Sequence, residues 1–457
     1  MKKNQIQNQS HTFDPWLAFA RIFLGVFWLY EVTIGHNWKV THPEWVGAGA
    51  GEYVINAGNR AIADGTWTWF GWFWAEWVIP YAAFWSYAVI ALQLAFGILF
   101  ILGLFVRPTA VVALAFDLSV FFLGNSRIPP LFSIGHMFVL LTNAGMYYGL
   151  DALIKQKVKD LTTSTKKVIH FLLHLPIVNE RTRPYFIGAS VVASIYYFLK
   201  IPMMETTRFQ MVSVELAALF ALGAFLFYMS KMQKDTIALA GSAVRIFIGF
   251  KFLHEIFVRD VPALNGMPGW GRPEQLTEVF QIIVNQHWPI VSSIVNQAFI
   301  PAVTFWAIVF AVVQTAVGIM LILGWKTQLA AKVGLVFVGL LILLGFTRYT
   351  AFIFGYLVTI MGVYGGRFGS LDAIGTKVKV QPQFISGKLM AILLGISIVA
   401  FIATLATGLI PDGYSETMGG FVGSFIAIFS LLFFVTGYIQ RKESITMIQD
   451  SPTKGAA

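Results

Sequence analysis

The sequence predicts an all-α, polytopic membrane protein, and this prediction rests on composition, on the length of the apolar runs and on an internal duplication. Of the 457 residues, 57% are hydrophobic and only 12% are charged. Several apolar runs approach or exceed the roughly 18–20 residues that cross a bilayer. Cysteine is absent, which excludes disulfides, cysteine-ligated clusters and thiol nucleophiles within the chain.

Twelve apolar runs are expected to form transmembrane helices. They span about 16–35, 82–104, 108–124, 131–149, 184–200, 211–230, 240–258, 302–325, 329–346, 349–366, 386–409 and 419–438. Lysines gather in alternate loops, for example at Lys155, Lys157, Lys166 and Lys167. The positive-inside rule therefore predicts a multi-pass protein of the cell membrane with both termini in the cytoplasm. The net charge of +10 follows from these loops and predicts no nucleic-acid partner.

An internal duplication organises the chain. Residues from about 78 match residues 221 positions later, so that Gln93 and Gly97 recur as Gln314 and Gly318. Further upstream the offset is 224, and "RIFLGVFWLYE" faces "RIFIGFKFLHE". Each copy contains six runs, an even number, which predicts two parallel six-helix repeats. The expected parts are a four-helix unit at 1–150, a linker with two helices at 151–238, a second four-helix unit at 239–375, and two further helices with a tail at 376–457.

The segments outside the apolar runs are less informative. A tryptophan-rich stretch follows the first run, and we expect it to lie in the membrane interface in preference to forming a compact domain. His170 and His174 stand four residues apart, a spacing that can bind metal, but no third ligand is near. We interpret that stretch as an amphipathic interfacial helix and predict no metal site.

The duplication repeats a glutamate near the outer end of the first run of each unit, as Glu31 and Glu255. A charge inside a bilayer costs about 2.5–3.5 kcal/mol on insertion scales, so a partner or a function is expected. Arg127 and Arg348 recur at the same membrane level. We predict that Glu31 pairs with Arg127 and Glu255 with Arg348, within each unit, either as a structural staple or as part of a substrate or quinone site.

Other groups break the symmetry between the copies. Asp117 corresponds to Val338, and Lys251 corresponds to Phe27. Isolated charges at this depth are costly, so we predict that Asp117 and Lys251 meet across the repeat interface, or that each meets a cavity, with a proton relay as one use. His254 replaces Tyr30 beside the glutamate, where it can exchange protons with a quinone headgroup.

Haem ligation is not favoured by the histidines of the apolar runs. His36 and His136 each lie near an end of a run, whereas a haem held inside the membrane needs two facing histidines.

The motifs of the four-helix block resemble those of a known family. "RIFLG", a long first outer loop and "GILFILGLFVRPTA" resemble the DoxX-like family, and most closely its DoxD-type membrane subunits of thiosulfate:quinone oxidoreductases. The resemblance covers about 16–150 and, more loosely, 240–372. It implies a DoxX-like four-helix unit in each repeat and a membrane subunit of a quinone-linked oxidoreductase, with the thiosulfate:quinone type as the expectation. Such a subunit passes electrons to a membrane quinone at an outer-leaflet site, with a separate redox subunit as partner.

Two groups of residues are the candidates for this site. We expect Glu31, Glu255, His254, Arg127 and Arg348 to take part in the chemistry. The residues expected to bind the quinone are Tyr30, His36, Trp28, Arg21 and Arg245.

Two alternatives remain open at this point. Two parallel six-helix halves also describe twelve-helix transporters, although the charged loop between the second and third spans of the major facilitator layout is absent. A non-catalytic anchoring subunit of a respiratory assembly would use the tryptophan-rich segments as a docking surface. The electron donor, the quinone type and the oligomeric state are open as well.

Overall fold

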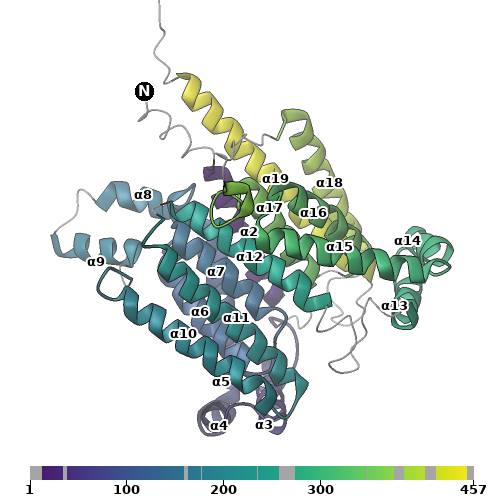
Figure 1. Ribbon diagram of the computed structural model, residues 1–457, viewed down its shortest axis with the longest axis horizontal. Helices are drawn as coiled ribbons and strands as arrows, with labels where there is room; N and C mark the ends of the chain where they lie inside the picture. Colours follow the sequence, from purple (N-terminus) through teal and green to yellow (C-terminus); the bar gives the residue numbers. More distant parts are fainter. Residues whose placement is uncertain are drawn as a thin grey trace, which may run out of the picture.

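A computed structural model describes nine segments of the chain. They are residues 13–33, 39–158, 163–175, 178–233, 235–256, 273–346, 348–374, 385–406 and 418–449. Every regular element in these segments is a helix (Figure 1). Eight helices are long and apolar enough to cross a membrane. The prediction of a helical, polytopic membrane protein is confirmed at this level.

The long apolar helices coincide with eight of the twelve predicted runs. They are α2 (Asp14–Thr33), α5 (Ala82–Leu102), α10 (Arg183–Lys200), α11 (Thr207–Met229), α12 (Thr236–His254), α15 (Val303–Leu323), α18 (Gly387–Ala406) and α19 (Met418–Gln449). The other four runs form shorter helices, α6 (Val106–Phe122), α7 (Pro129–Thr142), α16 (Thr327–Leu343) and α17 (Arg348–Gly362). With 14 to 17 residues each, they are shorter than the roughly 20 residues of a straight crossing. The number of twelve spans therefore stays a prediction.

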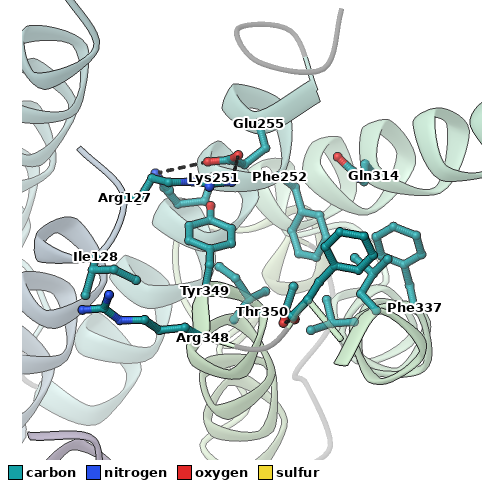
Figure 2. A pocket seen from close by; sticks show the side chains of 14 residues that line it. Arg127, Ile128, Lys251, Phe252, Glu255, Gln314, Phe337, Arg348, Tyr349 and Thr350 are labelled. Carbon is teal, nitrogen blue, oxygen red and sulfur yellow. Dashed lines mark hydrogen bonds and ion pairs between the residues drawn. The ribbon is translucent and has the colours of Figure 1, made fainter. Parts of the chain in front are cut away.

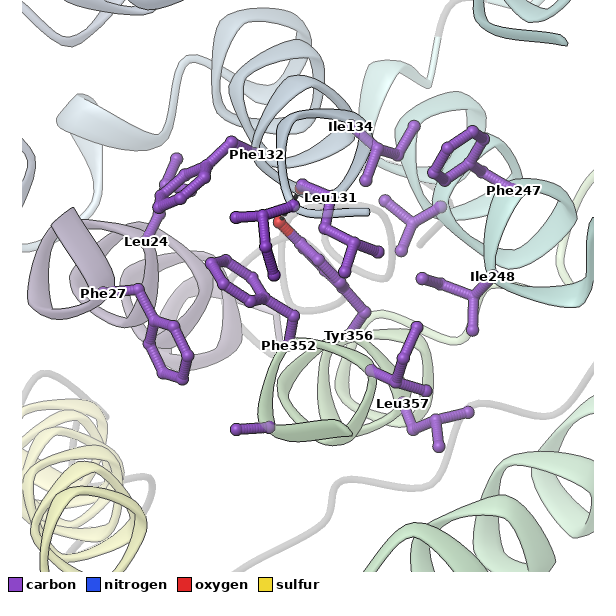
Figure 3. Packing of buried hydrophobic residues seen from close by; sticks show 14 of the residues in the cluster. Leu24, Phe27, Leu131, Phe132, Ile134, Phe247, Ile248, Phe352, Tyr356 and Leu357 are labelled. Carbon is purple, nitrogen blue, oxygen red and sulfur yellow. Dashed lines mark hydrogen bonds between the residues drawn. The ribbon is translucent and has the colours of Figure 1, made fainter. Parts of the chain in front are cut away.

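Four helices meet in the centre of the molecule, and they come from both sequence units. α2 packs against α7 and α17, and α12 packs against the same two helices. Figure 3 shows this core, in which the Phe27 and Phe352 rings lie 4.4 Å apart and the Phe132 and Phe352 rings 4.7 Å apart. The hydroxyl of Tyr356 donates to the Leu131 carbonyl. α19 covers the outer side of α2, and α11 covers α12, so each unit's last helix lies against the other unit's first.

Close helix packing depends on matching glycines. A Cβ added at Gly25 would lie 2.7 Å from the Gly97 carbonyl oxygen, and one added at Gly249 would lie 2.8 Å from that of Gly318. Real Cβ atoms do not approach backbone so closely, and packing at this density tolerates no extra methyl group without movement. The α2–α5 and α12–α15 contacts therefore both require glycine at positions that recur in the sequence.

The turns between helices also recur. Gly103 ends α5 at φ 65° and Gly324 ends α15 at φ 63°, a left-handed conformation that glycine adopts at little cost. Asp151 then accepts from the backbone N–H groups of Phe105 and Val106 at 2.7 and 3.1 Å, and Asp372 accepts from the equivalent pair at 2.7 and 2.8 Å. A remote carboxylate thus caps the N-terminus of α6 and of α16.

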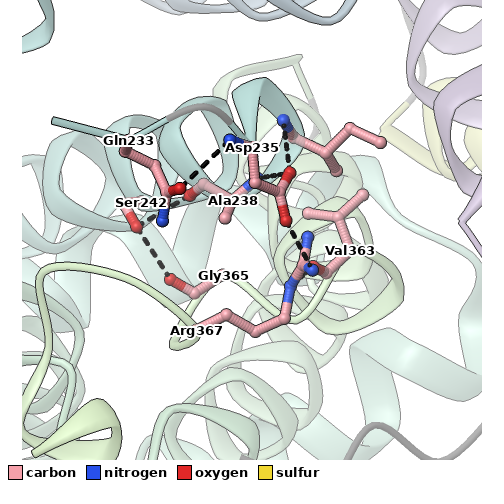
Figure 4. A network of polar contacts seen from close by, with 8 residues as sticks. Gln233, Asp235, Ala238, Ser242, Val363, Gly365 and Arg367 are labelled. Atoms are coloured by element: carbon pink, nitrogen blue, oxygen red, sulfur yellow. Dashed lines mark hydrogen bonds and ion pairs between the residues drawn. The ribbon is translucent and has the colours of Figure 1, made fainter. Parts of the chain in front are cut away.

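A polar network fixes the start of α12 to the segment after α17 (Figure 4). Asp235 caps α12 by accepting from the N–H groups of Ile237 and Ala238 at 3.0 Å each. Its other carboxylate oxygen accepts from Arg367 at 3.0 Å. Burial lowers the pKa of Arg367, and the nearby Asp235 carboxylate partly offsets the lowering. The Arg367 guanidinium also lies 4.1 Å from the centre of the Phe13 ring.

Short helices lie outside the bundle. α3 (Glu52–Ala63) and α4 (Thr68–Phe73) form one pair, and α13 (Pro273–Gln286) and α14 (Pro289–Ile294) form another (Figure 1). Trp45 and Trp67 are buried in this layer, whereas Trp69, Trp72 and Trp77 are more than half exposed. The tryptophan-rich stretch is therefore packed on one face and open on the other, and its place in the membrane interface stays a prediction.

The linker after α7 forms α8 (Leu150–Lys157) and α9 (Thr163–His174). In α9 the rings of His170 and His174 stack 4.1 Å apart. Across the part of the chain that the structure describes, no group of three histidine, aspartate or glutamate side chains could hold a metal ion.

Candidate functional site

A cavity of about 300 Å³ lies between the helices α12, α15, α16 and α17 and the loop between α6 and α7 (Figure 2). This volume is at the lower end of the roughly 300–1,000 Å³ typical of small-molecule sites. The lining residues are Arg127, Ile128, Lys251, Phe252, Glu255, Gln314, Phe337, Val338, Leu341, Phe346, Arg348, Tyr349, Thr350 and Ile353. Of the candidates from the sequence, Arg127, Glu255, Arg348 and Lys251 are thus brought together in one place.

Two matching turns deliver the arginines to the rim of the cavity. Gly124 and Gly345, at φ 89° and 97°, end α6 and α16 in a conformation that glycine favours. Arg127 follows the first turn, and Arg348 is the first residue of α17. Both guanidinium groups therefore reach the level at which α2 and α12 end.

The ion pairs cross between the sequence units. Arg348 Nε lies 2.6 Å from Glu31 Oε1, and its Nη2 group contacts the other carboxylate oxygen. Arg127 Nη2 lies 3.6 Å from Glu255 Oε2. The predicted pairing within each unit is wrong. In the central four-helix core α2 and α12 each pack against both α7 and α17, and at the ends of α2 and α12 the side chains pair across the units. Each glutamate therefore faces the arginine of the other copy.

The two crossing pairs differ in strength. The Arg348–Glu31 pair is bidentate and its carboxylate is 5% exposed, the geometry of a strong charge-assisted contact. The Arg127–Glu255 pair has one longer contact, and the arginine side chain is 55% exposed. The cavity lies beside the looser pair.

Lys251 has a different partner from the one predicted. Its ammonium group donates to Glu215 Oε1 of α11 and lies 3.9 Å from Glu255 Oε1. Both Lys251 and Glu215 are fully buried. The sequence pattern "MVSVELAALF" contained the signal for Glu215, a lone carboxylate in an apolar run, but gave no reason to place it beside α12.

Asp117 also has its own partners, so the predicted Asp117–Lys251 pair does not form. Asp117 Oδ2 lies 2.8 Å from His136 Nδ1 and accepts from the Ser133 hydroxyl at 2.9 Å. The physical reason is that α6 packs against α7, whereas α12 turns Lys251 toward α11. Asp117 and Lys251 therefore belong to two separate networks and not to one ion pair.

The remaining candidates lie away from the cavity wall. His254 Nδ1 lies 3.2 Å from Glu215 Oε1, and Tyr30 packs on Phe425 with ring centres 4.9 Å apart. Trp28 donates to His136 Nε2 at 3.0 Å. His36 lies outside the described residues.

Arg21 and Arg245 occupy equivalent carbonyl cages. Arg21 donates to the carbonyls of Phe100 and Ile101 at the end of α5. Arg245 donates to the equivalent carbonyls at the end of α15. Helix C-termini favour cations, and both guanidinium groups are fully buried. Their visible role is to cap helices, away from the cavity.

The cavity has a polar end and an apolar end. The polar end contains three cations, Arg127, Lys251 and Arg348, and each lies against a carboxylate. Its charges therefore balance. Lys251 and Arg127 both lie 5.5 Å from the centre of the Tyr349 ring, a cation–π distance.

The apolar end and one amide complete the cavity. The apolar end consists mainly of Phe252, Phe337, Leu341 and Ile353. The Oε1 atom of Gln314 is buried without a hydrogen-bond partner among the described residues, and a buried acceptor of this kind is costly unless it is satisfied. The arrangement suits an uncharged ligand that has hydrogen-bonding groups at one end and hydrocarbon at the other.

Lys39 adds a further buried cation next to the tighter pair. Its ammonium group donates to the backbone carbonyl of Glu31 at 3.0 Å. The pKa of Lys39 is lowered from 10.5 to about 8, mainly by burial. The charge of Glu31 opposes this lowering, and the charge of Arg348 adds to it. Lys39 braces the end of α2 and is not part of the cavity wall.

We compared the chain with models of protein families, with curated proteins and with solved structures. No family model, no curated protein and no solved structure matches it.

Proposed function

We propose that the chain is the membrane subunit of a quinone-linked oxidoreductase and that its cavity binds the quinone headgroup. The observation that carries the proposal is the cavity's balanced polar end beside an apolar end. A quinone headgroup is uncharged and has two carbonyl acceptors, so it matches this lining better than an ion does. The sequence resemblance supports the DoxX-like family and, within it, the thiosulfate:quinone type.

The cavity residues are suited to hydrogen-bond a quinone in both oxidation states. When bound, a quinone supplies an acceptor for two electrons and two protons. Lys251 carries N–H donors at the cavity wall, and the Glu255 carboxylate lies 3.9 Å from its ammonium group. The amide of Gln314 offers a donor to a carbonyl and an acceptor to a hydroxyl. Apolar side chains at the other end would receive the hydrocarbon tail.

The architecture we propose is two parallel six-helix units with twelve spans in the cell membrane and both termini in the cytoplasm. Its support comes from the matching glycine contacts, arginine cages and aspartate caps together with the lysine distribution. Electrons would enter from a separate redox subunit, because a chain without cysteine has no thiolates to hold an iron–sulfur cluster.

Quinone binding to the purified protein tests the proposal. The protein is reconstituted in nanodiscs, native quinone is extracted with solvent, and binding of a short-tailed quinone is measured by quenching of tryptophan fluorescence. We expect saturable binding, and we expect Phe252→Trp, which fills the cavity without removing a charge, to weaken it about tenfold or more.

A matched variant controls for the added indole. Ile308 lies on the outer face of α15 and is 60% exposed, so Ile308→Trp should leave binding unchanged. Equal affinity of the Phe252→Trp variant and the unmodified protein would overturn the placement of the quinone in this cavity. No saturable binding by any quinone class would overturn the function itself.

A transporter is the second candidate, and one observation favours it. The cavity lies between the sequence units, with Arg127 from the first and the other charged lining residues from the second, as substrate sites do in transporters with two parallel halves. Uptake of a solute into proteoliposomes, lost in Phe252→Trp and unaffected by quinone, would establish this function instead.

A further inference from the structure

The side chains that line the cavity in the second unit can be compared with those at the matching positions of the first unit. Phe337 and Gln314 in the second unit correspond to Phe116 and Gln93 in the first. Most other wall positions differ: at Leu341, Phe346 and Tyr349 the first unit has the smaller side chain, and at two positions it has the larger one. Phe252 corresponds to Trp28, and Ile353 corresponds to Phe132.

The larger side chains of the first unit are in direct ring contact. The Trp28 indole stacks on Phe132 with ring centres 4.0 Å apart, and it meets the edges of Phe96 and Phe116 at 5.3 and 5.7 Å. Trp28 is 2% exposed. The indole thus packs among aromatic rings at the position where the second unit has Phe252 and Ile353 in the cavity wall.

A hydrogen-bonded chain holds the indole in place. An indole N–H can only donate, so the 3.0 Å contact from Trp28 makes His136 Nε2 the acceptor. His136 Nδ1 then carries the hydrogen and donates to Asp117 Oδ2 at 2.8 Å, where the Ser133 hydroxyl also donates. His136 and Asp117 are both buried. Their matching residues in the second unit are Leu357 and Val338, which can form no such chain.

We propose that the first unit contains a second, latent ligand site that Trp28 closes, with His136 and Asp117 as the residues that hold it closed. The chain therefore binds one ligand, in the second unit, because Trp28 and Phe132 prevent a second ligand from binding in the first. The proposal rests on the proposed function only for the identity of the ligand. It also gives a role to the buried charge of Asp117, which does not line the cavity of the second unit.

The native absence of cysteine allows a test that needs no quinone. Single cysteines are placed at Gln314→Cys, in the cavity wall, and at the matching Gln93→Cys, and their reaction with a small methanethiosulfonate reagent is timed in nanodiscs. Both glutamines are buried, at 4% and 6% exposed, so entry of the reagent through the cavity that Gln314 lines decides the rate. We expect Gln314→Cys to react and Gln93→Cys to react at least about tenfold more slowly.

Exchanging the wall residues should exchange the reactivities. In the Gln93→Cys background, Trp28→Phe with Phe132→Ile should raise the reaction rate toward that of Gln314→Cys. In the Gln314→Cys background, Phe252→Trp with Ile353→Phe should lower it by about tenfold or more. Equal rates at the two native positions, or no change on either exchange, would overturn the proposal.

The holding role of His136 has its own readout. His136→Leu, which copies the second unit, should raise the Gln93→Cys rate, whereas His136→Gln keeps one acceptor and one donor and should restore slow reaction. A cysteine at Ala18, which is fully buried in α2, must stay unreactive in each variant. If the opened variants also expose Ala18→Cys, they are unfolding, and the filling exchange at Phe252 and Ile353 decides the question alone.

Stoichiometry links the result to the ligand. The Trp28→Phe, Phe132→Ile protein should bind two short-tailed quinones per chain in place of one. Altered thiol rates without any quinone binding would keep the latent site and reject the quinone, so the two proposals fail separately. Altered thiol rates with one quinone still bound would reject the latent site as a ligand site.

Discussion

Arg348 and Arg127 occupy matching positions, but their surroundings predict different effects on stability. Arg348 makes a bidentate contact with a carboxylate that is 5% exposed. Removing one partner of a buried pair leaves a charge without compensation and costs about 3–5 kcal/mol. Arg348→Ala should therefore lower the free energy of unfolding by about 3 kcal/mol, measured by unfolding in mixed micelles.

Arg127→Ala is the matched control for this variant. Its side chain is 55% exposed and its single contact to Glu255 is 3.6 Å long, so the expected loss is about 0–1 kcal/mol. Equal losses in the two variants would contradict the asymmetry of the crossing pairs.

Lys39 predicts a pH dependence on the alkaline side. Burial lowers its pKa from 10.5 to about 8, so within this window the unfolded chain binds a proton that the native protein has released. Stability should therefore rise with pH between these two values, by about 3 kcal/mol in total. The rise should be absent in Lys39→Met and retained in a control variant of Lys157, which is exposed on α8. Parallel pH curves for the protein and Lys39→Met would contradict the prediction.

At the scale of the helix, Asp151 predicts a local effect at the start of α6. Its carboxylate accepts from the N–H groups of Phe105 and Val106, which have no partner within the helix. Asp151→Ala should cost about 1–2 kcal/mol and speed hydrogen exchange at the first turn of α6. Asp151 is buried, whereas Asp372 is partly exposed, so Asp372→Ala should have the smaller effect. Unchanged exchange in Asp151→Ala would show that water replaces the cap.

Some helix contacts can be predicted from the type of residue at one position in the sequence, and others cannot. Gly25 and Gly97 match Gly249 and Gly318 in the sequence, and both pairs support a close helix crossing. Arg21 and Arg245, by contrast, are predicted to bind a ligand, and in the structure they donate to carbonyls at helix ends. A buried arginine in an apolar run is compatible with either role, because the carbonyls that receive it belong to other segments.

At the scale of the whole molecule, orientation in the membrane is the main prediction. The exposed residues Asn59 on α3 and Ser164 on α9 should lie on opposite sides, with α9 in the cytoplasm. In the cysteine-free chain, an impermeant maleimide should label Asn59→Cys in intact cells and Ser164→Cys only after permeabilisation. The reverse result would invert the proposed orientation.

The crossing of the two units is a property of the whole molecule that periodicity alone does not contain. Hydropathy places Glu31 and both arginines at one membrane level, but it cannot say which neighbouring helix each faces. In a duplicated chain each glutamate can pair with either of two equivalent arginines. Because α2 and α12 each pack against both α7 and α17, the pairing depends on the positions of the side chains at the ends of these helices, where Glu31 meets Arg348 and Glu255 meets Arg127.

The sequence by itself determined that this is a helical membrane protein, which residues recur, and which buried charges break the recurrence. These features depend on composition and on residue identity at each position, and both can be read along the chain. Only the tertiary structure decided that Glu31 meets Arg348, that Lys251 meets Glu215 and that Asp117 meets His136. It also decided that Lys251 and Glu255 border a cavity and that the Trp28 indole packs on Phe132. Pairing and free volume depend on side chains from several helices at once, and their mutual positions are set by packing.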